Sequence, residues 1–594
     1  MDAVPTLLVV LLAAQVAAAR PPECRASAFG AQPSRTRCQT VALQAAIDAC
    51  SSSCGTVVVD APGTYLTASL LLTGCVHLRL LGNREDYGAA QPDWYLLRFH
   101  NCSGCSLSGG GKVDGRAQRW VLPESSAVRQ LGGWAGSGHK AVRNWADPSC
   151  AKPDECRPRL VGVVDSTDVA ITGLRLRDPV YWCLHVLRSQ RVHISQLSIR
   201  GDWDIPNNDG IDIDGSRGVT VRDAEVDTAD DAICLKTTTP GWPLENVTVS
   251  DCRLRSRSSA VKLGSESVAD MRRISFARLS IADSHRGLAI QLRDGGSISH
   301  VRFQNVSAST RLYHPSWWGA AEPIYITAVP RNRSTQVGFM HNVTFSDIKA
   351  ISENGIFIAG GPLPHSSGRV AGGGSAVAAG SLAHAPEQEQ QQRQQQQQRQ
   401  QQQQQQGHRQ QYSISGITLE RVQLQLVGRS QWPGGCQDYR PSSNSTGAVG
   451  ASPSGSSSDS SALSSSSQGR GWWPAGLDCS AHSTAPLWVA GSEHVLLSDI
   501  QIRHNQPWRA DWARRPHVDR SSTTDIQLQR VSISSSGLGM QQLLQGMRLE
   551  LGGLALPALV SCKLLAAACA GLAAAAVFVC IAQATRFSWR RLHI

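Results

Sequence analysis

Residues 169–533 lack the 3.6-residue spacing of apolar side chains that marks amphipathic helices, which excludes a mainly helical architecture for this region. A short segment in which apolar and polar residues alternate recurs instead, and this alternation is typical of half-buried strands. The first six copies begin 23, 27, 28, 27 and 27 residues apart. The copies start at Val169, Val192, Val219, Val247, Ile274 and Val301, and later ones start at Val343, Ile417, Val495 and Ile526.

This repetition predicts an all-β solenoid, in which each repeat forms one coil of a parallel β-helix. An ordinary β-sandwich is the alternative, but its strands recur every 8–12 residues or so without such near-copies. With 594 residues the chain is long enough for a large core. We expect the β-helix to occupy residues 20–545, with a Gln-rich disordered insertion at 363–412 and a Ser-rich one at 437–472.

No nucleic-acid-binding motif is visible, although the chain carries a formal net charge of +11. A basic extracellular protein favours acidic partners, and polyuronate sugars belong to that class. A solvated basic surface without any partner is an equally open interpretation. We therefore expect no nucleic-acid partner and, if the charge has a partner, an acidic polysaccharide.

Histidines do not accompany the cysteines in the way that zinc sites require, and we expect neither a metal nor another cofactor. Fourteen of the seventeen cysteines lie between Cys24 and Cys479, which favours disulfides in an oxidising compartment. The predicted short-loop disulfides are Cys50/Cys54, Cys102/Cys105 and Cys150/Cys156.

Both ends of the chain favour export. Residues 1–19 form an apolar run that predicts a signal peptide cleaved before Arg20, although Asp2 stands where Lys or Arg is usual. Six N-x-S/T triplets agree with secretion and glycosylation. They begin at Asn101, Asn246, Asn305, Asn332, Asn342 and Asn444.

The C-terminal region contains an uncharged stretch, residues 564–582, that is long enough to cross a bilayer as a helix. The basic residues after it predict that 583–594 form a cytoplasmic tail, with the β-helix outside the cell. A cleaved lipid-anchor signal is less favoured, because such signals end in the apolar run itself.

Three acidic residues carry the strongest functional signal. Asp209 precedes Asp230 by 21 residues and Asp231 by 22, which is close to one repeat. Neighbouring coils stack about 4.8 Å apart, so we expect the three carboxylates to converge. Clustered carboxylates raise one another's pKa, which suits acid–base chemistry. The alternative is that these residues only cap turns, because Asp-Gly and Asn-Asp are common turn formers.

The motif Asn207-Asn208-Asp209-Gly210-Ile211-Asp212, with Asp230-Asp231, resembles the N-T-D-G and D-D patterns of glycoside hydrolase family 28, the polygalacturonase family. The resemblance runs from about Phe29 to Val531, apart from the insertions. Residues 29–50 and 55–72 resemble the family's N-terminal cap, a helix and first coil, and the segment from Trp317 resembles a less typical branch. The resemblance implies a right-handed parallel β-helix with a short N-terminal cap helix.

The resemblance also implies hydrolysis of a glycosidic bond with inversion, for which the carboxyl groups stand roughly 6.5–9.5 Å apart. By the family's pattern Asp230 is the general acid, and Asp209 and Asp231 activate water. Asn207 then helps to hold the site. The residues expected to supply positive charge to a uronate and to the ionised aspartates are Lys236, Lys262 and Arg293.

Two departures from the family's pattern affect substrate binding. The G-H-G motif falls on Ser258-Ser259-Ala260, and the R-I-K motif falls on Ala289-Ile290-Gln291. Arg293 shares a strand face with Gln291, so it either replaces the lost charge or is a solvated arginine. The nearest histidines are His185 and His285, and a lone histidine is more often structural.

These observations favour an inverting hydrolase of a pectin-like or other acidic cell-wall polysaccharide, acting as a monomer. The alternative is a β-helical ectodomain that binds polysaccharide with little or no turnover. A lyase is a third possibility, in which the three aspartates bind calcium as hard oxygen ligands.

Overall fold

The computed structural model describes residues 21–81, 83–85, 95–121, 139–140, 142, 157–314, 319–331, 335–361, 413–430, 485–505, 515–520 and 522–535. By contacts the chain divides into Met1–Ser536 and Gly537–Ile594, and every described residue belongs to the first unit. The predicted signal peptide, both insertions, the span 564–582 and the tail lie outside the described residues. Within the described part, no helix is long and apolar enough to cross a membrane.

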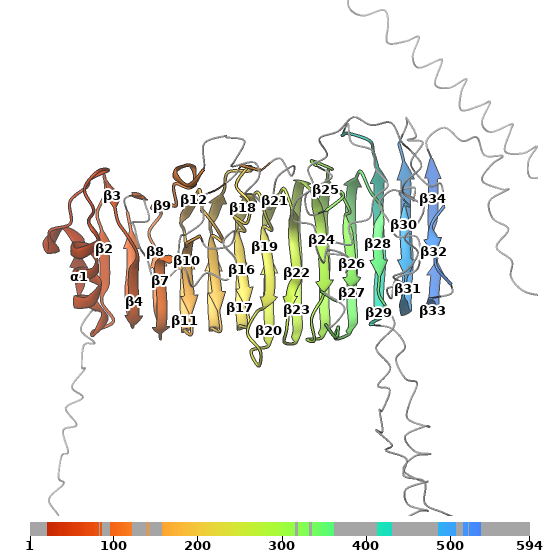
Figure 1. Cartoon of the computed structure of the whole chain (residues 1–594), viewed down its shortest axis with the longest axis horizontal. Helices are drawn as coiled ribbons and strands as arrows, with labels where there is room; N and C mark the ends of the chain where they lie inside the picture. The colour runs from red at the N-terminus through yellow and green to blue at the C-terminus, as the bar shows by residue number, and fades with distance from the viewer. Residues whose placement is uncertain are drawn as a thin grey trace, which may run out of the picture. The chain divides into compact units, whose positions relative to one another are not determined.

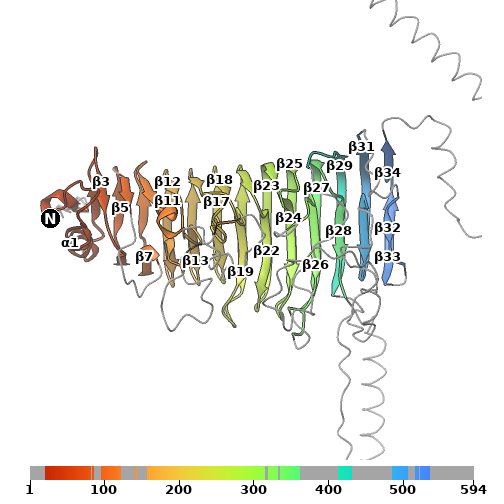
Figure 2. The ribbon, with the colours of Figure 1, turned by 45° about the horizontal axis from the view of Figure 1, so that its top comes forward.

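The chain winds through stacked coils whose strands pair in parallel with the strands one coil before and one coil after (Figures 1 and 2). The first ladder of strands forms a sheet of its own and positions the candidate site. Its strands are β4 (Leu70–Gly74), β7 (Tyr95–Cys102), β10 (Arg159–Val164), β13 (Leu184–Leu187), β16 (Ile211–Asp214), β19 (Ile233–Thr237), β22 (Ser259–Ser267), β24 (Arg286–Leu292), β26 (Ile324–Ala328), β28 (Ile356–Ala359), β30 (Leu487–Ala490) and β32 (His517–Val518).

Two further ladders form the other walls of the coils. The second contains β1 (Glu23–Arg25), β2 (Thr56–Val59), β5 (His77–Leu80), β8 (Ser106–Ser108), β11 (Thr167–Thr172), β14 (Gln190–Ser195), β17 (Arg217–Arg222), β20 (Leu244–Ser250), β23 (Met271–Ser284), β25 (Ile298–Thr310), β27 (Met340–Ser352), β29 (Ile414–Leu426), β31 (Ser492–His504) and β33 (Thr523–Gln529). The third contains β3 (Thr64–Leu66), β6 (Asn83–Glu85), β9 (Lys112–Asp114), β12 (Arg175–Arg177), β15 (Ser198–Arg200), β18 (Glu225–Thr228), β21 (Arg253–Ser256) and β34 (Ser532–Ser535). The long strand β23 pairs with both β20 and β21, so the two ladders merge there.

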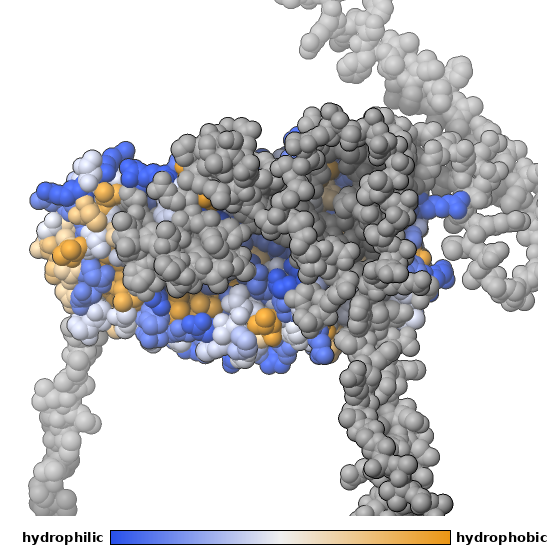
Figure 3. All heavy atoms as spheres, viewed as in Figure 1, coloured by the Kyte–Doolittle hydropathy of each residue, from blue (hydrophilic) through white to orange (hydrophobic). Residues whose placement is uncertain are grey.

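The register of the strands confirms the repeat that the sequence predicts. Val247 pairs with Ile274, and Ile274 pairs with Val301, so equivalent residues of successive repeats stack inside the coils. The rings of Phe276, Phe303 and Phe345 stack in the same way, with centroids 4.7 and 4.6 Å apart. One continuous apolar core therefore fills the interior of the stack, and hydrophilic residues are spread over the described surface (Figure 3). The expected parallel β-helix is confirmed.

An N-terminal cap covers the first coil. Helix α1 (Thr40–Ser51) follows the short 3₁₀ helix η1 (Ala26–Phe29), and a second such helix, η2 (Ala117–Trp120), lies further along the chain. The buried face of α1 carries apolar residues at helical spacing, which is how a cap helix closes a solenoid core. These residues are Leu43, Ala46, Ile47 and Cys50.

The disulfides of this cap differ from the short-loop pairs that the sequence predicts. Cys50 pairs with Cys24, and Cys54 pairs with Cys75, so the predicted Cys50/Cys54 bond is wrong. The reason is that Cys50 lies on the buried face of α1, toward β1, and Cys54 lies beyond the end of the helix. Cys102 and Cys105 are close but unbonded, and Cys150 and Cys156 lie outside the described residues.

Candidate active site

The site lies where strands β16 and β19 of the first ladder begin. Ile211 pairs with Ile233, so Asp209 and Asp231, each two residues earlier, occupy equivalent positions in adjacent coils. Gly210 donates a backbone hydrogen bond to the carbonyl oxygen of Asp231 at 2.9 Å. A Cβ atom at Gly210 would stand 2.3 Å from Val226 Cγ1 and 2.4 Å from the Ala232 oxygen, so only glycine fits this close approach of the coils.

The structure brings the three predicted aspartates together. One carboxylate oxygen from each of Asp209, Asp230 and Asp231 lies within 4.8 Å of the other two, and all three residues are buried. At their nearest atoms the carboxylates are closer than the separation of roughly 6.5–9.5 Å that an inverting pair is expected to show. The spacing of adjacent coils, about 4.8 Å, explains this short approach.

Asp230 is held by Asn207 and by the backbone of its neighbour. Asn207 adopts the left-handed conformation, with φ of 59°, and its backbone N–H donates to Asp230 Oδ2 at 3.2 Å. The Asp231 N–H donates to Asp230 Oδ1 at 2.9 Å. Arg157 in turn donates to Asn207 Oδ1 at 2.6 Å. Burial, followed by the charge of Asp231, raises the pKa of Asp230 to about 6.

Asn208 fixes the turn that carries Asp230 from the other side. Its side-chain oxygen accepts hydrogen bonds from the N–H groups of Ala229 and Asp230, at 2.8 and 3.2 Å. Its amide group donates to the Asp202 carbonyl oxygen at 2.8 Å. The paired asparagines therefore anchor one aspartate of the next coil through two separate contacts.

Asp231 has the opposite environment, because each of its oxygens has a partner. Oδ1 accepts hydrogen bonds from the Ser258 hydroxyl at 2.9 Å and from the Ser259 N–H at 3.0 Å. Oδ2 lies 2.9 Å from Lys262 Nζ. Burial alone would raise the pKa of Asp231, but the charges of Lys262 and Lys236 and these hydrogen bonds lower it. Asp231 is therefore the ionised member of the trio.

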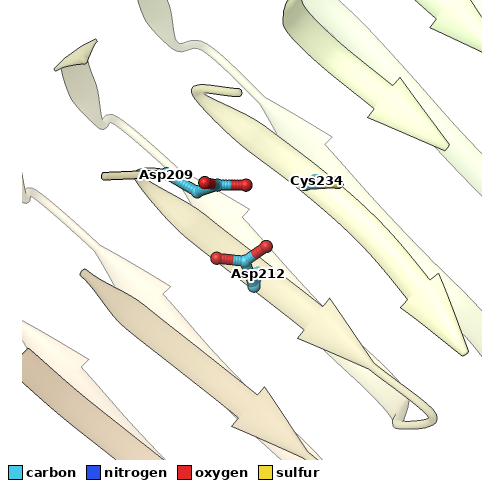
Figure 4. A group of neighbouring side chains, drawn as sticks. All are labelled: Asp209, Asp212 and Cys234. Carbon is cyan, nitrogen blue, oxygen red and sulfur yellow. The ribbon is translucent and has the colours of Figure 1, made fainter. Parts of the chain in front are cut away.

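A fourth carboxylate, Asp212, stands beside Asp209 on β16 (Figure 4). Asp212 is fully buried, and its two oxygens accept no hydrogen bond within the described residues. Lys236 Nζ lies 3.8 Å from Asp212, 4.0 Å from Asp209 and 3.2 Å from Glu266. Burial and mutual repulsion raise the pKa of Asp209 and of Asp212, so both carboxyls favour the protonated form.

The charges within this cluster do not balance. Asp209, Asp212, Asp230, Asp231 and Glu266 carry five negative charges when ionised, and Lys236 and Lys262 carry two positive ones. Buried, uncompensated charge is costly, so the cluster retains protons that exposed carboxyls would lose. The arrangement supplies a proton donor and an ionised acceptor within one small volume.

Cation binding is a second chemical possibility for these groups. The trio is one set with suitable ligand atoms, and Asp209, Asp212 and Cys234 form another within 4.8 Å (Figure 4). Lys236 and Lys262 already provide positive charge at the same carboxylates. That charge opposes the entry of a further cation.

The predicted cations occupy different environments. Lys236 and Lys262 pair with carboxylates of the cluster and so leave no free charge for a uronate. Arg293 is buried, and its Nε and Nη2 atoms have no hydrogen-bond partner in the described part of the chain. Burial and the neighbouring Arg331 lower the pKa of Arg293 to about 10. Arg293 is therefore buried rather than solvated, and it does not contact the three aspartates directly.

The two histidines that the sequence singles out have structural partners. His185 lies 2.8 Å from the Tyr95 hydroxyl and 3.4 Å from Asp214, and burial lowers its pKa to about 4. His285 Nδ1 lies 3.0 Å from the Arg257 carbonyl oxygen. The hydroxyl of Ser259, at the family's histidine position, is buried and has no hydrogen-bond partner among the described residues.

Sequence reasoning missed several residues of the site, among them Asp212, Glu266, Arg157 and Trp182. One signal was available for Asp212, because it pairs with Cys234, and Cys234 pairs with Lys262. Counting one more repeat along the chain places Asp212, Cys234 and Lys262 in one row across adjacent coils. Glu266 lies within a register shift in the pairing of β19 with β22, so no constant period could place it.

Comparisons with known proteins agree with this geometry. The model of glycosyl hydrolases family 28 matches residues 82–361. A polygalacturonase of Chamaecyparis obtusa is 26% identical over 270 residues, which cover 43% of this chain and 48% of that protein. A probable endo-xylogalacturonan hydrolase A of Neosartorya fischeri is 25% identical over 271 residues, covering 43% and 59%. The chain thus spans about half the length of these curated relatives.

A solved structure gives a likeness of fold. The family 28 exopolygalacturonase of Yersinia enterocolitica aligns with a TM-score of 0.50 at 14% identity, covering 88% of this chain and 80% of that one. At this identity the match concerns the β-helix alone. The family match contains all the aspartates of the site, from Asp209 to Asp231. On this ground the chain is similar to glycosyl hydrolases family 28 and is polygalacturonase-like.

Proposed function

We propose that the protein hydrolyses glycosidic bonds of a pectin-like or other acidic polysaccharide, with inversion at the anomeric carbon. The observation that carries this proposal is the contrast between Asp230, whose pKa is raised to about 6, and the ionised Asp231 beside it. Two carboxyls whose environments push their pKa values apart make a matched acid and base. The match to the family 28 model and the polygalacturonases among the relatives support the same reaction and substrate class.

In the proposed reaction, Asp230 donates its proton to the glycosidic oxygen as the bond to the anomeric carbon breaks. Water attacks that carbon from the opposite face and passes its proton to Asp231. Asp209 has an Oδ1 atom without a hydrogen-bond partner among the described residues, and this atom orients the water. Asp209 already carries a proton, because its pKa is raised, so the proton of the water goes to the ionised Asp231.

Inversion is favoured over a covalent intermediate by the partners of Asp231. Both of its oxygens are engaged, one by Lys262 and the other by Ser258 and the Ser259 N–H. A carboxylate whose two oxygens are both held in this way is hindered from approaching the sugar to form an ester. The short distance between the carboxylates is the observation that opposes inversion, so the stereochemistry needs its own measurement.

Export to the cell exterior is part of this proposal. The disulfides Cys24–Cys50 and Cys54–Cys75 suit an oxidising compartment. Four of the N-x-S/T asparagines lie among the described residues, and all four are exposed within strands, at positions of positive φ, where a glycan can be attached. They are Asn101, Asn246, Asn305 and Asn342. The membrane span at 564–582, the monomeric state and the absence of nucleic-acid partners stay predictions from the sequence.

The direct test is to incubate the protein and its Asp230→Asn variant with a panel of plant and algal cell-wall polysaccharides and to count new reducing ends. Release by the native protein alone would support hydrolysis with Asp230 as the acid, and the panel would identify the substrate. Unsaturated ends would indicate a lyase. No release from any polysaccharide by folded protein would favour a binding ectodomain and would overturn the proposal.

A further inference from the structure

One row of residues continues from the aspartates toward the N-terminal coils. Tyr95 is the first residue of β7, and it pairs with Arg159, the first residue of β10. Val161 pairs with Leu184, which places Arg159 in line with Trp182 one coil on. Leu184 pairs with Ile211, which places Trp182 in line with Asp209. Since coils are spaced by about 4.8 Å, Arg159 lies two coils, roughly 10 Å, from Asp209 along the stack.

Arg159 is surrounded by aromatic rings rather than by carboxylates. Its guanidinium carbon lies 4.5 Å from the ring centroid of Trp182, 5.1 Å from that of Tyr181 and 5.8 Å from that of Tyr95. The side chain is half-buried, and its Nε atom is buried with no hydrogen-bond partner in the described part of the chain. These rings fix the orientation of the guanidinium.

Other arginines of the same coils show what is missing at Arg159. Arg188 donates from Nε and Nη2 to the two oxygens of Asp165, and Arg191 donates in the same way to Asp168. This two-pronged contact is the geometry in which guanidinium binds carboxylate most strongly. Arg159 makes no such two-pronged contact with a carboxylate among the described residues.

Trp182 links Arg159 to the reacting groups. Its ring is half-buried and lies between the guanidinium of Arg159 and Lys236, whose Nζ is 4.7 Å from the ring centroid. Lys236 in turn faces Asp209 and Asp212. A sugar bound against Trp182 would therefore be adjacent to the sugar at the aspartates, with Arg159 on its far side.

We propose that Arg159 and Trp182 form a subsite for a uronate next to the bond that is cleaved, an inference that rests on the proposed function. The exposed part of Trp182 contacts the sugar, and Arg159 binds the carboxylate through its guanidinium. This subsite supplies a cation for the acidic substrate, which Lys236 and Lys262 do not, because both are paired with carboxylates of the cluster. A purely structural role, in which Arg159 only stacks on the rings, is the competing explanation.

Binding without turnover separates these explanations. Calorimetry would measure the affinity of the full chain for a galacturonate hexamer and for its fully methyl-esterified form, with Asp230→Asn as the background that prevents hydrolysis. Adding Arg159→Met should weaken binding of the galacturonate hexamer by about tenfold or more, as expected for loss of a charged hydrogen-bonded contact. Binding of the methyl ester should change by less than about twofold, because it offers no carboxylate.

The matched control is Arg191→Met, which removes the same charge from the second ladder, where Arg191 pairs with Asp168. This variant should bind both hexamers like the background. Trp182→Ala should weaken binding of both hexamers, because the contact of Trp182 with the sugar does not depend on the carboxylate. Thermal unfolding of each variant would verify that it is folded.

Unchanged affinity of the Arg159→Met variant for the galacturonate hexamer would overturn the subsite, as would an equal loss of affinity for both hexamers. Failure of the background to bind either hexamer would also overturn it. Release of reducing ends by the native chain tests the proposed function separately. A chain that cleaves polysaccharide but fails this binding test would retain the proposed function and lose the uronate subsite.

Discussion

Lys262 Nζ lies 2.9 Å from Asp231 Oδ2, within a cluster in which the carboxyls of Asp209 and Asp212 favour their protonated forms. As a consequence, two aspartates that are adjacent in the sequence differ in protonation. Asp231 is ionised, whereas the pKa of Asp230 is raised to about 6. The contact between β19 and β22 thereby determines which of two adjacent aspartates is the acid and which is the base.

Replacing Lys262 by methionine should remove the main cause of the lowered pKa of Asp231. Once that pKa rises, the base is protonated over a wider acidic range, so the acidic limb of the pH–rate profile should move to higher pH. We expect kcat/KM at pH 5 to fall by roughly a hundredfold, because general-base catalysis contributes about that much or more. A pH series of initial rates measures the shift.

Lys112→Met is the control for that series, because Lys112 pairs with Asp114 on β9, away from the site. Its profile should match that of the native protein. An acidic limb that stays in place in the Lys262→Met variant would show that Lys262 does not determine the protonation of the base.

Because the pKa of Asp230 is raised, we expect the stability of the protein to depend on pH. Its folded pKa of about 6 is above the ordinary value of 3.8 for an aspartate, so the folded state binds the proton more tightly than the unfolded state. The stability contributed by this proton is fully present below about pH 4 and is lost as the pH rises through 6. Asp230→Asn should therefore raise the free energy of unfolding at pH 8 by up to about 3 kcal/mol, from about 1.4 kcal/mol per pKa unit.

Chemical denaturation at pH 4 and at pH 8 would measure this difference, which should be small at pH 4. Asp231→Asn provides the opposite case, because the pKa of Asp231 is lowered and its loss leaves Lys262 buried without its partner. That variant should be destabilised at pH 8, by about 3–5 kcal/mol. Stabilisation by both substitutions, or by neither, would contradict the assigned protonation states.

The N-terminal cap predicts a specific pair of disulfides. Peptide mapping of unreduced protein should recover Cys24 linked to Cys50 and Cys54 linked to Cys75. Cys54→Ser should lower the free energy of unfolding by about 2–4 kcal/mol, because the bond closes a loop of 21 residues. A linked Cys50–Cys54 peptide would contradict the arrangement of α1 against β1.

The sequence predicts the parts of this molecule that repeat. Strands such as β20 and β25 have the same alternation of apolar and polar residues, so the solenoid and the convergence of Asp209 with Asp231 follow from counting one period. The cap disulfides and Glu266 do not follow, because they depend on the packing of α1 and on a shift in strand register. Arg159 has no distinguishing spacing, and only its ring contacts identify it.

The most direct test of the account is to follow polysaccharide cleavage by proton NMR during the first minutes of the reaction, in native protein and in Asp230→Asn. The account predicts that native protein releases a new reducing end whose anomeric configuration is opposite to that of the cleaved bond, and that the variant releases almost none. Retained configuration would show that an aspartate acts as a nucleophile, as the short distance between the carboxylates would allow. Signals of an unsaturated sugar, or equal release by both proteins, would contradict the account.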